Sequence, residues 1–272
     1  MKTILLNDED SLLPSIPFVP DLMNSPNLAH LLQVSDDAIH RIATLTTGQR
    51  SNVNWHRTRV GRLTGSVLGD ILNFLDKHPN STSLSKTLRS KLFNPPSHGQ
   101  ALVYGNHHEA DGVLSFKTRF RTDVAETGIW LHPKGWLGSS PDGLVGLDGV
   151  LEIKCPFSWR ELDVRVALRN TRIGPLTTVD GKGKPISLPI ARNSDGKLYL
   201  IPNHNYYHQV QAHLLVTGRQ HCFFFIWTPK GSLMVKVEVD NTWREANIKR
   251  LEHFYFNIYL DAFKAHYSQY VH

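Results

Sequence analysis

Hydrophobic residues along the chain switch between helical and strand spacing, and this pattern predicts a mixed α/β domain. Where apolar positions recur every three or four residues, amphipathic helices are expected. These stretches are 25–32, 35–45, 64–75, 98–120, 157–170, 206–218 and 242–267. Shorter apolar runs bounded by turn residues predict strands at 123–133, 136–146, 149–156, 221–229 and 233–240. We therefore expect a mixed central β-sheet flanked by helices.

Local signals mark where several of these elements begin and end. Ser35, followed by two acids, is a good N-cap, and Ser158 is predicted to cap the helix at 157–170. Gly218 is expected to end its helix. The Asp-Gly pair at Asp148 favours a hairpin between two of the predicted strands. The basic stretch 54–62 is expected to be a strand or a loop.

Two regions stand apart from the predicted α/β pattern. Residues 1–50 are polar and proline-punctuated, and we assign them to an N-terminal helical extension of a main domain at 51–272. Residues 171–205 form a glycine- and proline-rich insertion with two weak strand signals. The insertion carries a set of basic residues: Lys182, Lys184, Arg192 and Lys197.

Composition narrows the setting in which the protein works. Of 272 residues, 40% are hydrophobic and 20% are charged, as in ordinary globular proteins. The net charge of +6 is mild evidence for a polyanionic partner, although a merely basic surface would give the same value. Two cysteines, both in strand-like runs, favour a reducing compartment. With no signal-peptide pattern and no membrane-length apolar run, we expect a soluble intracellular protein of cytoplasm or nucleus.

Candidate chemistry is concentrated in the segment SPDGLVGLDGVLEIKCP, residues 140–156. In a strand, alternate side chains share a face, so Glu152 and Lys154 point one way and their apolar neighbours point the other. Asp142 lies on the partner strand of the hairpin and can sit beside Glu152. Two converging carboxylates repel unless a cation lies between them. Hard oxygen ligands without sulfur suit Mg²⁺ or Mn²⁺.

Such a cluster implies hydrolysis of a phosphodiester. A divalent ion lowers the pKa of bound water and polarises a phosphoryl oxygen, and Lys154 would neutralise charge or hold the attacking water. The plain alternative is a surface hairpin with a Glu–Lys pair, because such pairs are abundant and contribute little energy.

Five ordered segments resemble the lambda-exonuclease-like, YqaJ-type viral recombinases of the PD-(D/E)XK nuclease superfamily. One of them is the hairpin segment described above, with its Pro-Asp and Glu-x-Lys motifs. The others are WHRTRVGRLTGSVLGDIL, YGNHHE, YYHQVQAHLLVTG and HCFFFIWTP, and together they cover roughly residues 54–230. The resemblance implies a restriction-endonuclease-like core and a hydrolase that acts as a nuclease in DNA recombination or DNA repair.

The resemblance also implies roles for individual residues. Asp142 and Glu152 would be the principal metal ligands, with the Ile153 carbonyl a third. Glu109 would add its carboxylate to the same site, and Lys154 would orient or activate water. Gln209 would hold Lys154 or the scissile phosphate, and Arg59 and Ser66 would bind the phosphate of the DNA end. The further candidate DNA contacts are Gln211, Arg57 and Arg62.

The implied enzyme is a Mg²⁺-dependent exonuclease, with one or two ions and Mn²⁺ as a substitute, that digests double-stranded DNA ends from the 5′ side. A 5′-phosphate would mark the end, and a single-strand annealing protein is an implied partner. The rival hypotheses are a structure-specific or nicking endonuclease on the same core and a DNA-binding recombination partner that has lost catalysis. The basic insertion at 171–205 could contact DNA, block the ring-like trimer that some members of the family form, or do neither. Together with the N-terminal residues it leaves open whether the protein forms an oligomer.

Overall fold

The computed structural model describes residues 17–95, 99–180 and 183–269. The strands of this part of the chain form three sheets, in the orders β1-β3-β2, β10-β9-β5-β4 and β6-β7-β8. The first two sheets are mixed, because β1–β3 and β5–β9 are parallel pairs and the remaining pairs in both are antiparallel. The α/β class with mixed sheets flanked by helices is thus confirmed, although the predicted central sheet is divided in two.

The strands of the described residues lie between residues 63 and 238. Their bounds are β1 Leu63–Thr64, β2 Trp130–Leu131, β3 Leu137–Ser139, β4 Gly143–Val145, β5 Gly149–Lys154, β6 Gly174–Val179, β7 Pro185–Arg192, β8 Leu198–Leu200, β9 His221–Thr228 and β10 Gly231–Glu238.

The helices surround these sheets. Their bounds are α1 Val19–Leu22, α2 Leu28–Leu31, α3 Asp36–Leu45, α4 Val53–Arg59, α5 Leu68–Lys77, α6 Lys86–Phe93, α7 Gln100–Phe120, α8 Val166–Asn170, α9 Asn205–Thr217, α10 Asn241–Phe254 and α11 Leu260–Tyr267. A π-helical turn, Tyr255–Tyr259, joins the last two, and short 3₁₀ turns cover Gln49–Ser51, Gly65–Val67 and Phe157–Trp159. None of the described helices has the length and apolarity needed to cross a bilayer.

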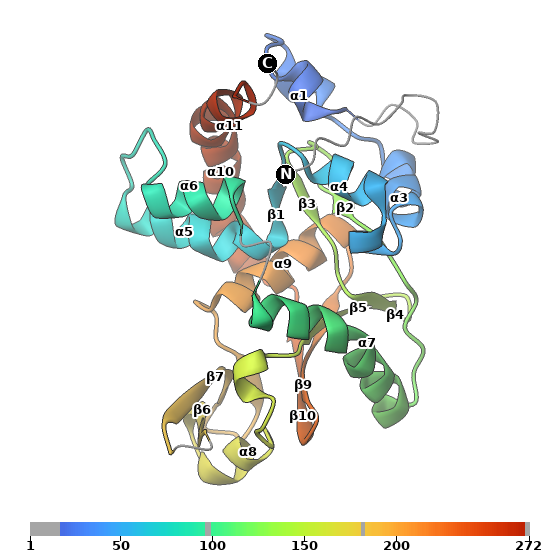
Figure 1. Cartoon of the computed structure of the whole chain (residues 1–272), viewed down its shortest axis with the longest axis vertical. Coiled ribbons are helices and arrows are strands. Elements are labelled where there is room, and N and C mark those ends of the chain that lie inside the picture. The colour runs from blue at the N-terminus through green and yellow to red at the C-terminus, as the bar shows by residue number, and fades with distance from the viewer. Residues whose placement is uncertain (1–16, 96–98, 181–182, 270–272) are drawn as a thin grey trace.

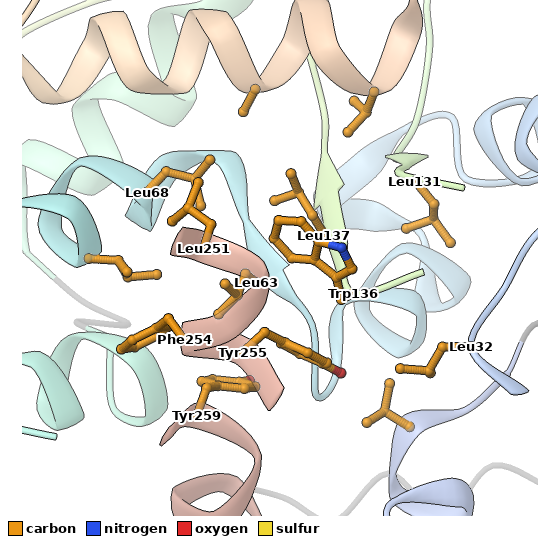
Figure 2. Close-up of a cluster of buried hydrophobic side chains, with 14 of the residues drawn as sticks. Leu32, Leu63, Leu68, Leu131, Trp136, Leu137, Leu251, Phe254, Tyr255 and Tyr259 are labelled. Atoms are coloured by element: carbon orange, nitrogen blue, oxygen red, sulfur yellow. The ribbon is translucent and has the colours of Figure 1, made fainter. Parts of the chain in front are cut away.

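The larger hydrophobic core joins the two ends of the described chain. Figure 2 shows Leu32 from the N-terminal region, Leu63 of β1 and Trp136 next to β3 converging on Tyr255 and its neighbours in the C-terminal helices. These side chains are almost fully buried, so much of the stability of the fold comes from this long-range contact. The described residues 17–49 therefore share the main core, while the domain boundary at 50 remains a prediction.

Strand β5 lies in the middle of the second sheet, with helices on both faces. Its apolar side chains on one face, Leu151 and Ile153, pack with Phe116 of α7. On the other face Val150 packs with Val210 and Leu214 of α9. Figure 1 shows α7 running past one face of the sheet while α9 crosses the other. The polar side chains of β5 on the α9 face are consequently shielded from water.

Most of the predicted elements are confirmed, and four differ. The predicted strand 136–146 is divided into β3 and β4, which belong to different sheets. The stretch 54–62 is mainly helix α4 rather than a strand or loop, because the Asn52 side chain accepts the Asn54 N–H as an N-cap. Residues 157–170 do not form one helix capped by Ser158. They begin as a 3₁₀ turn, and the Thr228 hydroxyl then binds the Leu162 carbonyl and holds the segment away from helical geometry. The insertion folds as the β6-β7-β8 sheet, one strand more than predicted.

Candidate active site

The alternation of β5 places the predicted pair on one face, as expected. Glu152 and Lys154 lie toward α9, while the apolar alternate residues lie toward α7. Glu152 is only 2% exposed, and Lys154 is mostly buried with its ammonium 4.7 Å from the centre of the Tyr206 ring. A surface Glu–Lys pair, the plain alternative, is thereby excluded, because both charges lie inside the protein.

Asp142 lies directly before β4 and beside Glu152. Its backbone N–H donates to the Leu151 carbonyl at 2.9 Å, which continues the β4–β5 ladder by one residue. Its side-chain Oδ2 accepts the Ile153 N–H at 2.6 Å, and the residue as a whole is partly buried. The N–H and C=O of a strand residue face the same neighbour, so the Ile153 carbonyl also faces the edge where Asp142 lies.

Glu152 is held by three side-chain donors from two elements. Its Oε1 accepts from the Lys154 ammonium and, at 2.8 Å, from Nε2 of Gln209. Its Oε2 is 2.8 Å from Nε2 of His213. The Lys154 ammonium also donates to Oε1 of Gln209 at 3.2 Å, so Gln209 bridges the lysine and the glutamate.

Burial and charge move the two carboxyl pKa values in opposite directions. Burial, followed by the charges of Glu152 and Glu109, raises the pKa of Asp142 well above its ordinary value. Burial would raise the pKa of Glu152 as well, but the Lys154 ammonium and His213 outweigh it and lower that pKa to about 2. Burial opposes the charge of Lys154 too, yet Glu152 and Tyr206 raise its pKa above the ordinary value. The lysine is therefore a permanent cation near neutral pH.

Two residues of this network, His213 and Ser139, were missed by the sequence interpretation. His213 lies four residues after Gln209 on α9, so both side chains project from one face of that helix. Nδ1 of His213 is 2.8 Å from Oγ of Ser139, which lies at the end of β3. The i, i+4 spacing of Gln209 and His213 in the sequence was the available signal.

Glu109 reaches the site from α7 and is paired with Arg50 at 3.2 Å. The helix approaches β5 closely at Gly112, where a Cβ atom would lie 2.6 Å from Cγ2 of Ile153. The loop that carries Arg50 is fixed by Gln49, whose amide donates to the carbonyls of Thr127 and Pro141. Arg50 was not among the predicted site residues, and its isolated position in a polar segment gave no sequence signal.

Arg59 and Ser66 lie on the chain leading into and out of β1. The Arg59 guanidinium stacks on Trp55, 3.9 Å from the ring centre, and the Trp55 indole N–H donates to Ser140 Oγ at 2.9 Å. Burial, together with the charge of Arg50, lowers the pKa of Arg59 to about 10. Ser66 is exposed in the 3₁₀ turn ahead of α5. The tryptophan thus places Arg59 next to the Pro-Asp turn that carries Asp142.

Arg57 lies farther from the turn. Its guanidinium is 5.0 Å from the ring centre of Phe18, and the side chain is partly exposed. Of the basic insertion residues, Lys184 and Lys197 are exposed, Arg192 donates to the Thr171 carbonyl, and Lys182 lies outside the described residues. None of these contacts ties the insertion to Asp142 or Glu152.

Two predicted DNA-contacting residues are corrected by the structure. Arg62 is 3% exposed, and its guanidinium donates to the carbonyls of Gly135, Thr58 and Pro17. Gln211 is fully buried, with its amide bonded to the Glu238 carbonyl and the Asp240 N–H. Both side chains use their hydrogen-bonding groups to hold the backbone, so neither is available to a nucleic acid.

The donor set suits a hard divalent cation but is not a complete site by side chains alone. Across the described residues, no three His, Cys, Asp or Glu side chains gather closely enough to hold a metal ion. Asp142, Glu152 and the Ile153 carbonyl supply oxygen donors, and burial together with the charges of Glu152 and Glu109 disfavours the ionised form of Asp142. Oxygen donors and water are the ligands that Mg²⁺ and Mn²⁺ prefer, so the residues fit such an ion.

The family model of the YqaJ-like viral recombinase domain matches residues 54–220, more than half of the chain. The chain belongs to this family. All of the site residues described above except Arg50 lie within the matched range, and the Asp142 and Glu152 pair lies near its middle. The comparison with curated protein sequences found no match.

Solved structures similar to this YqaJ-like chain include two exonucleases and a SOX–DNA complex. The alkaline exonuclease LHK-Exo from Laribacter hongkongensis is 22% identical with a TM-score of 0.47, covering 79% of this chain and 92% of that one. A phage-related exonuclease from Haemophilus somnus 129PT is 10% identical with a TM-score of 0.48, covering 76% and 96%. A SOX–DNA complex is 14% identical with a TM-score of 0.49, covering 87% and 75%. Because the sequence identities are below 25% and the TM-scores are below 0.5, these similarities carry no conclusion about the substrate of this chain.

Proposed function

We propose that this YqaJ-like protein is a metal-dependent deoxyribonuclease that digests double-stranded DNA from its 5′ ends. The observation that carries the proposal is the buried network of Glu152, Lys154 and Gln209, with Asp142 beside it. Buried acids that face one another serve no purpose in a protein that only binds a polyanion. Their arrangement instead suits hydrolysis of a phosphodiester.

Asp142, Glu152 and the Ile153 carbonyl would hold one Mg²⁺ or Mn²⁺ ion, with Glu109 reaching it directly or through water. When bound, the ion supplies Lewis-acid chemistry, lowering the pKa of water and offsetting charge at the phosphoryl group; a second ion would serve the leaving oxygen. In the structure, the carboxylate of Glu109 is paired with the guanidinium of Arg50 at 3.2 Å. Arg50 would exchange this carboxylate for a DNA phosphate as the substrate arrives.

Lys154 orients the attacking water rather than taking its proton. Its pKa is raised, so the ammonium keeps its proton and can only donate hydrogen bonds. Gln209 fixes the direction of that ammonium by accepting one of its hydrogens while donating to Glu152. Held in this way, Lys154 can donate to a water or a phosphate oxygen on the side away from Glu152 and stabilise the negative charge of the transition state.

Arg59 and Ser66 would receive the phosphate of the DNA end. Within the described residues Arg59 has no carboxylate partner, and its stacking on Trp55 leaves the edge of the guanidinium free for two parallel hydrogen bonds. Ser66 presents an exposed hydroxyl at the entry to α5. A 5′-phosphate bound here would set which strand enters the site, which is the basis of the proposed polarity.

The decisive experiment compares end-labelled linear duplex with closed circular DNA in Mg²⁺ and in EDTA. We expect mononucleotides from linear DNA only, no cutting in EDTA, and faster digestion of 5′-phosphorylated than 5′-hydroxyl ends. Cut circles would replace the exonuclease by an endonuclease on the same site. Retarded but intact DNA in Mg²⁺ would overturn the enzyme assignment and leave a binding protein.

A further inference from the structure

His213 is the most buried polar side chain of the site, and no motif assigned it a role. It is 1% exposed, with Nε2 at 2.8 Å from Glu152 Oε2 and Nδ1 at 2.8 Å from Ser139 Oγ. An ionised carboxylate only accepts hydrogen bonds, so Nε2 must carry a hydrogen. The Ser139 hydroxyl, which can donate or accept, then satisfies Nδ1. Both ring nitrogens are therefore engaged, and the ring is fixed in its plane.

Ser139 is itself held firmly. It pairs with Trp130 across the β2–β3 ladder and is 3% exposed. Gly65 packs against it so closely that a Cβ at position 65 would lie 2.1 Å from Ser139 Oγ. Only glycine permits this approach. A continuous buried contact thus runs from the turn that carries Ser66, through Ser139 and His213, to the Glu152 carboxylate.

The three donors divide the two oxygens of Glu152 between them. Lys154 and Gln209 bind Oε1, and His213 alone among the described residues binds Oε2 with its side chain. Without His213, the carboxylate would be held at one oxygen only and could rotate about its terminal bond. Groups that hold a metal ligand in this way usually change metal affinity or activity by 10- to 100-fold when removed.

We propose that His213 is a positioning residue that holds Glu152 Oε2, so that the carboxylate is oriented for a divalent cation, and that Ser139 holds His213. This inference rests on the proposed function. It assigns the residue no contact with DNA, because the histidine is enclosed between α9, β3 and β5. The expected consequence of its loss is weaker metal binding with unchanged binding of the DNA end.

The test measures Mn²⁺ binding by isothermal titration calorimetry without DNA for the wild type, His213→Ala and His213→Gln. We expect His213→Ala to weaken the binding affinity for Mn²⁺ about 10- to 100-fold. His213→Gln should recover much of that loss, because the glutamine amide can place an N–H donor toward Glu152. Affinity for 5′-phosphorylated duplex in EDTA should stay within about twofold of wild type for all three.

The matched control is His208→Ala. His208 is another buried histidine of α9, where Nδ1 accepts the indole N–H of Trp243 at 2.9 Å, away from Glu152. Its loss should lower the melting temperature and leave Mn²⁺ affinity unchanged. If His208→Ala weakens Mn²⁺ as much as His213→Ala does, the effect is general loosening of α9 and the proposal is wrong.

Two further outcomes separate this inference from the function on which it rests. Wild-type protein that binds no Mn²⁺ and cuts no DNA would overturn both. Wild-type protein that cuts, with folded His213→Ala that binds Mn²⁺ normally, would overturn only the role of His213. Should His213→Ala fail to fold, Ser139→Ala decides: about tenfold weaker Mn²⁺ supports the proposal, and unchanged affinity refutes it.

Discussion

Arg62 and Glu152 are two buried charges in different regions of the molecule, and different hydrogen-bond partners stabilise each of them. Arg62 donates to three backbone carbonyls, and burial lowers its pKa to about 10 despite the raising effect of Tyr255 and Tyr259. Glu152 accepts from three side chains, but a second carboxyl, Asp142, faces it. Both residues have hydrogen-bond partners, so burial and partner number do not distinguish them.

The two regions differ in the charges and hydrogen-bonding groups that remain available to a ligand. Around Arg62 every bond is to a neutral carbonyl of the chain itself, so the region holds the fold and has nothing to offer a ligand. Around Glu152 the carboxyl of Asp142 is destabilised in its charged form, and Arg59, stacked on Trp55 beside the Pro-Asp turn, has no acidic partner among the described residues. An excess of like charge that a ligand could relieve is the better indicator of a binding site than a buried charge alone.

The largest expected effect comes from Glu152→Gln. The substitution keeps the shape but removes the anionic oxygens, which are expected to contribute several kcal/mol to catalysis through a bound cation. Cleavage of linear duplex should fall by about a thousandfold. Gel-shift affinity for the same DNA in EDTA should persist. Cleavage within tenfold of wild type would show that the buried network is not the catalytic centre.

Next in size is Arg62→Met, which tests the other region. It fills similar volume but leaves three buried carbonyls without donors, and each such loss costs about 1–3 kcal/mol. We expect the free energy of unfolding in urea to fall by about 3 kcal/mol or more. Activity per folded molecule and DNA affinity should not change. A specific loss of DNA binding at full stability would restore Arg62 as a DNA contact.

Arg59→Gln should have a moderate effect confined to DNA ends. Loss of a charge-assisted phosphate contact is worth about 1.5–3 kcal/mol, so affinity for 5′-phosphorylated duplex should fall about tenfold or more. Affinity for 5′-hydroxyl duplex and thermal stability should change little. Arg57→Gln is the matched control, because this arginine lies on the same helix but away from the Pro-Asp turn, and it should not discriminate the two ends.

The smallest expected effect is a gain of stability in Asp142→Asn. The asparagine can still accept the Ile153 N–H, but it removes a carboxylate that burial and Glu152 disfavour. Without metal, the free energy of unfolding near neutral pH should rise by roughly 1 kcal/mol, while cleavage is lost. An unchanged or lower stability would mean that Asp142 is not under charge repulsion.

The pH dependence of stability provides a second test of charge repulsion at Asp142. A raised native pKa means that the wild type loses stability as pH rises above about 4, the ordinary value for aspartate. Asp142→Asn should lack this loss. Glu152 has the opposite sign, since its pKa is lowered to about 2, so its contribution is present above its ordinary value and disappears as pH falls toward 2. Urea unfolding across pH 2–8 would measure both.

The sequence by itself determined the parts of the site that depend on local periodicity. The two-residue repeat of a strand put Glu152 and Lys154 on one face, and the hairpin signal brought Asp142 beside them. The helical pattern and Gly218 fixed α9 and with it the place of Gln209. These features follow from backbone geometry within a few residues, which a sequence pattern records directly.

Only the tertiary structure decided which polar side chains serve the backbone and which serve the site. Arg62 and Gln211 looked like surface groups until the packing of distant segments enclosed them among carbonyls and amides. The sequence does not distinguish His213 from the other histidines. The packing of α9 against β3 and β5 places it between Ser139 and Glu152. Hydrogen-bond partners 61 to 74 residues apart are set by how elements pack, and no local pattern encodes that distance.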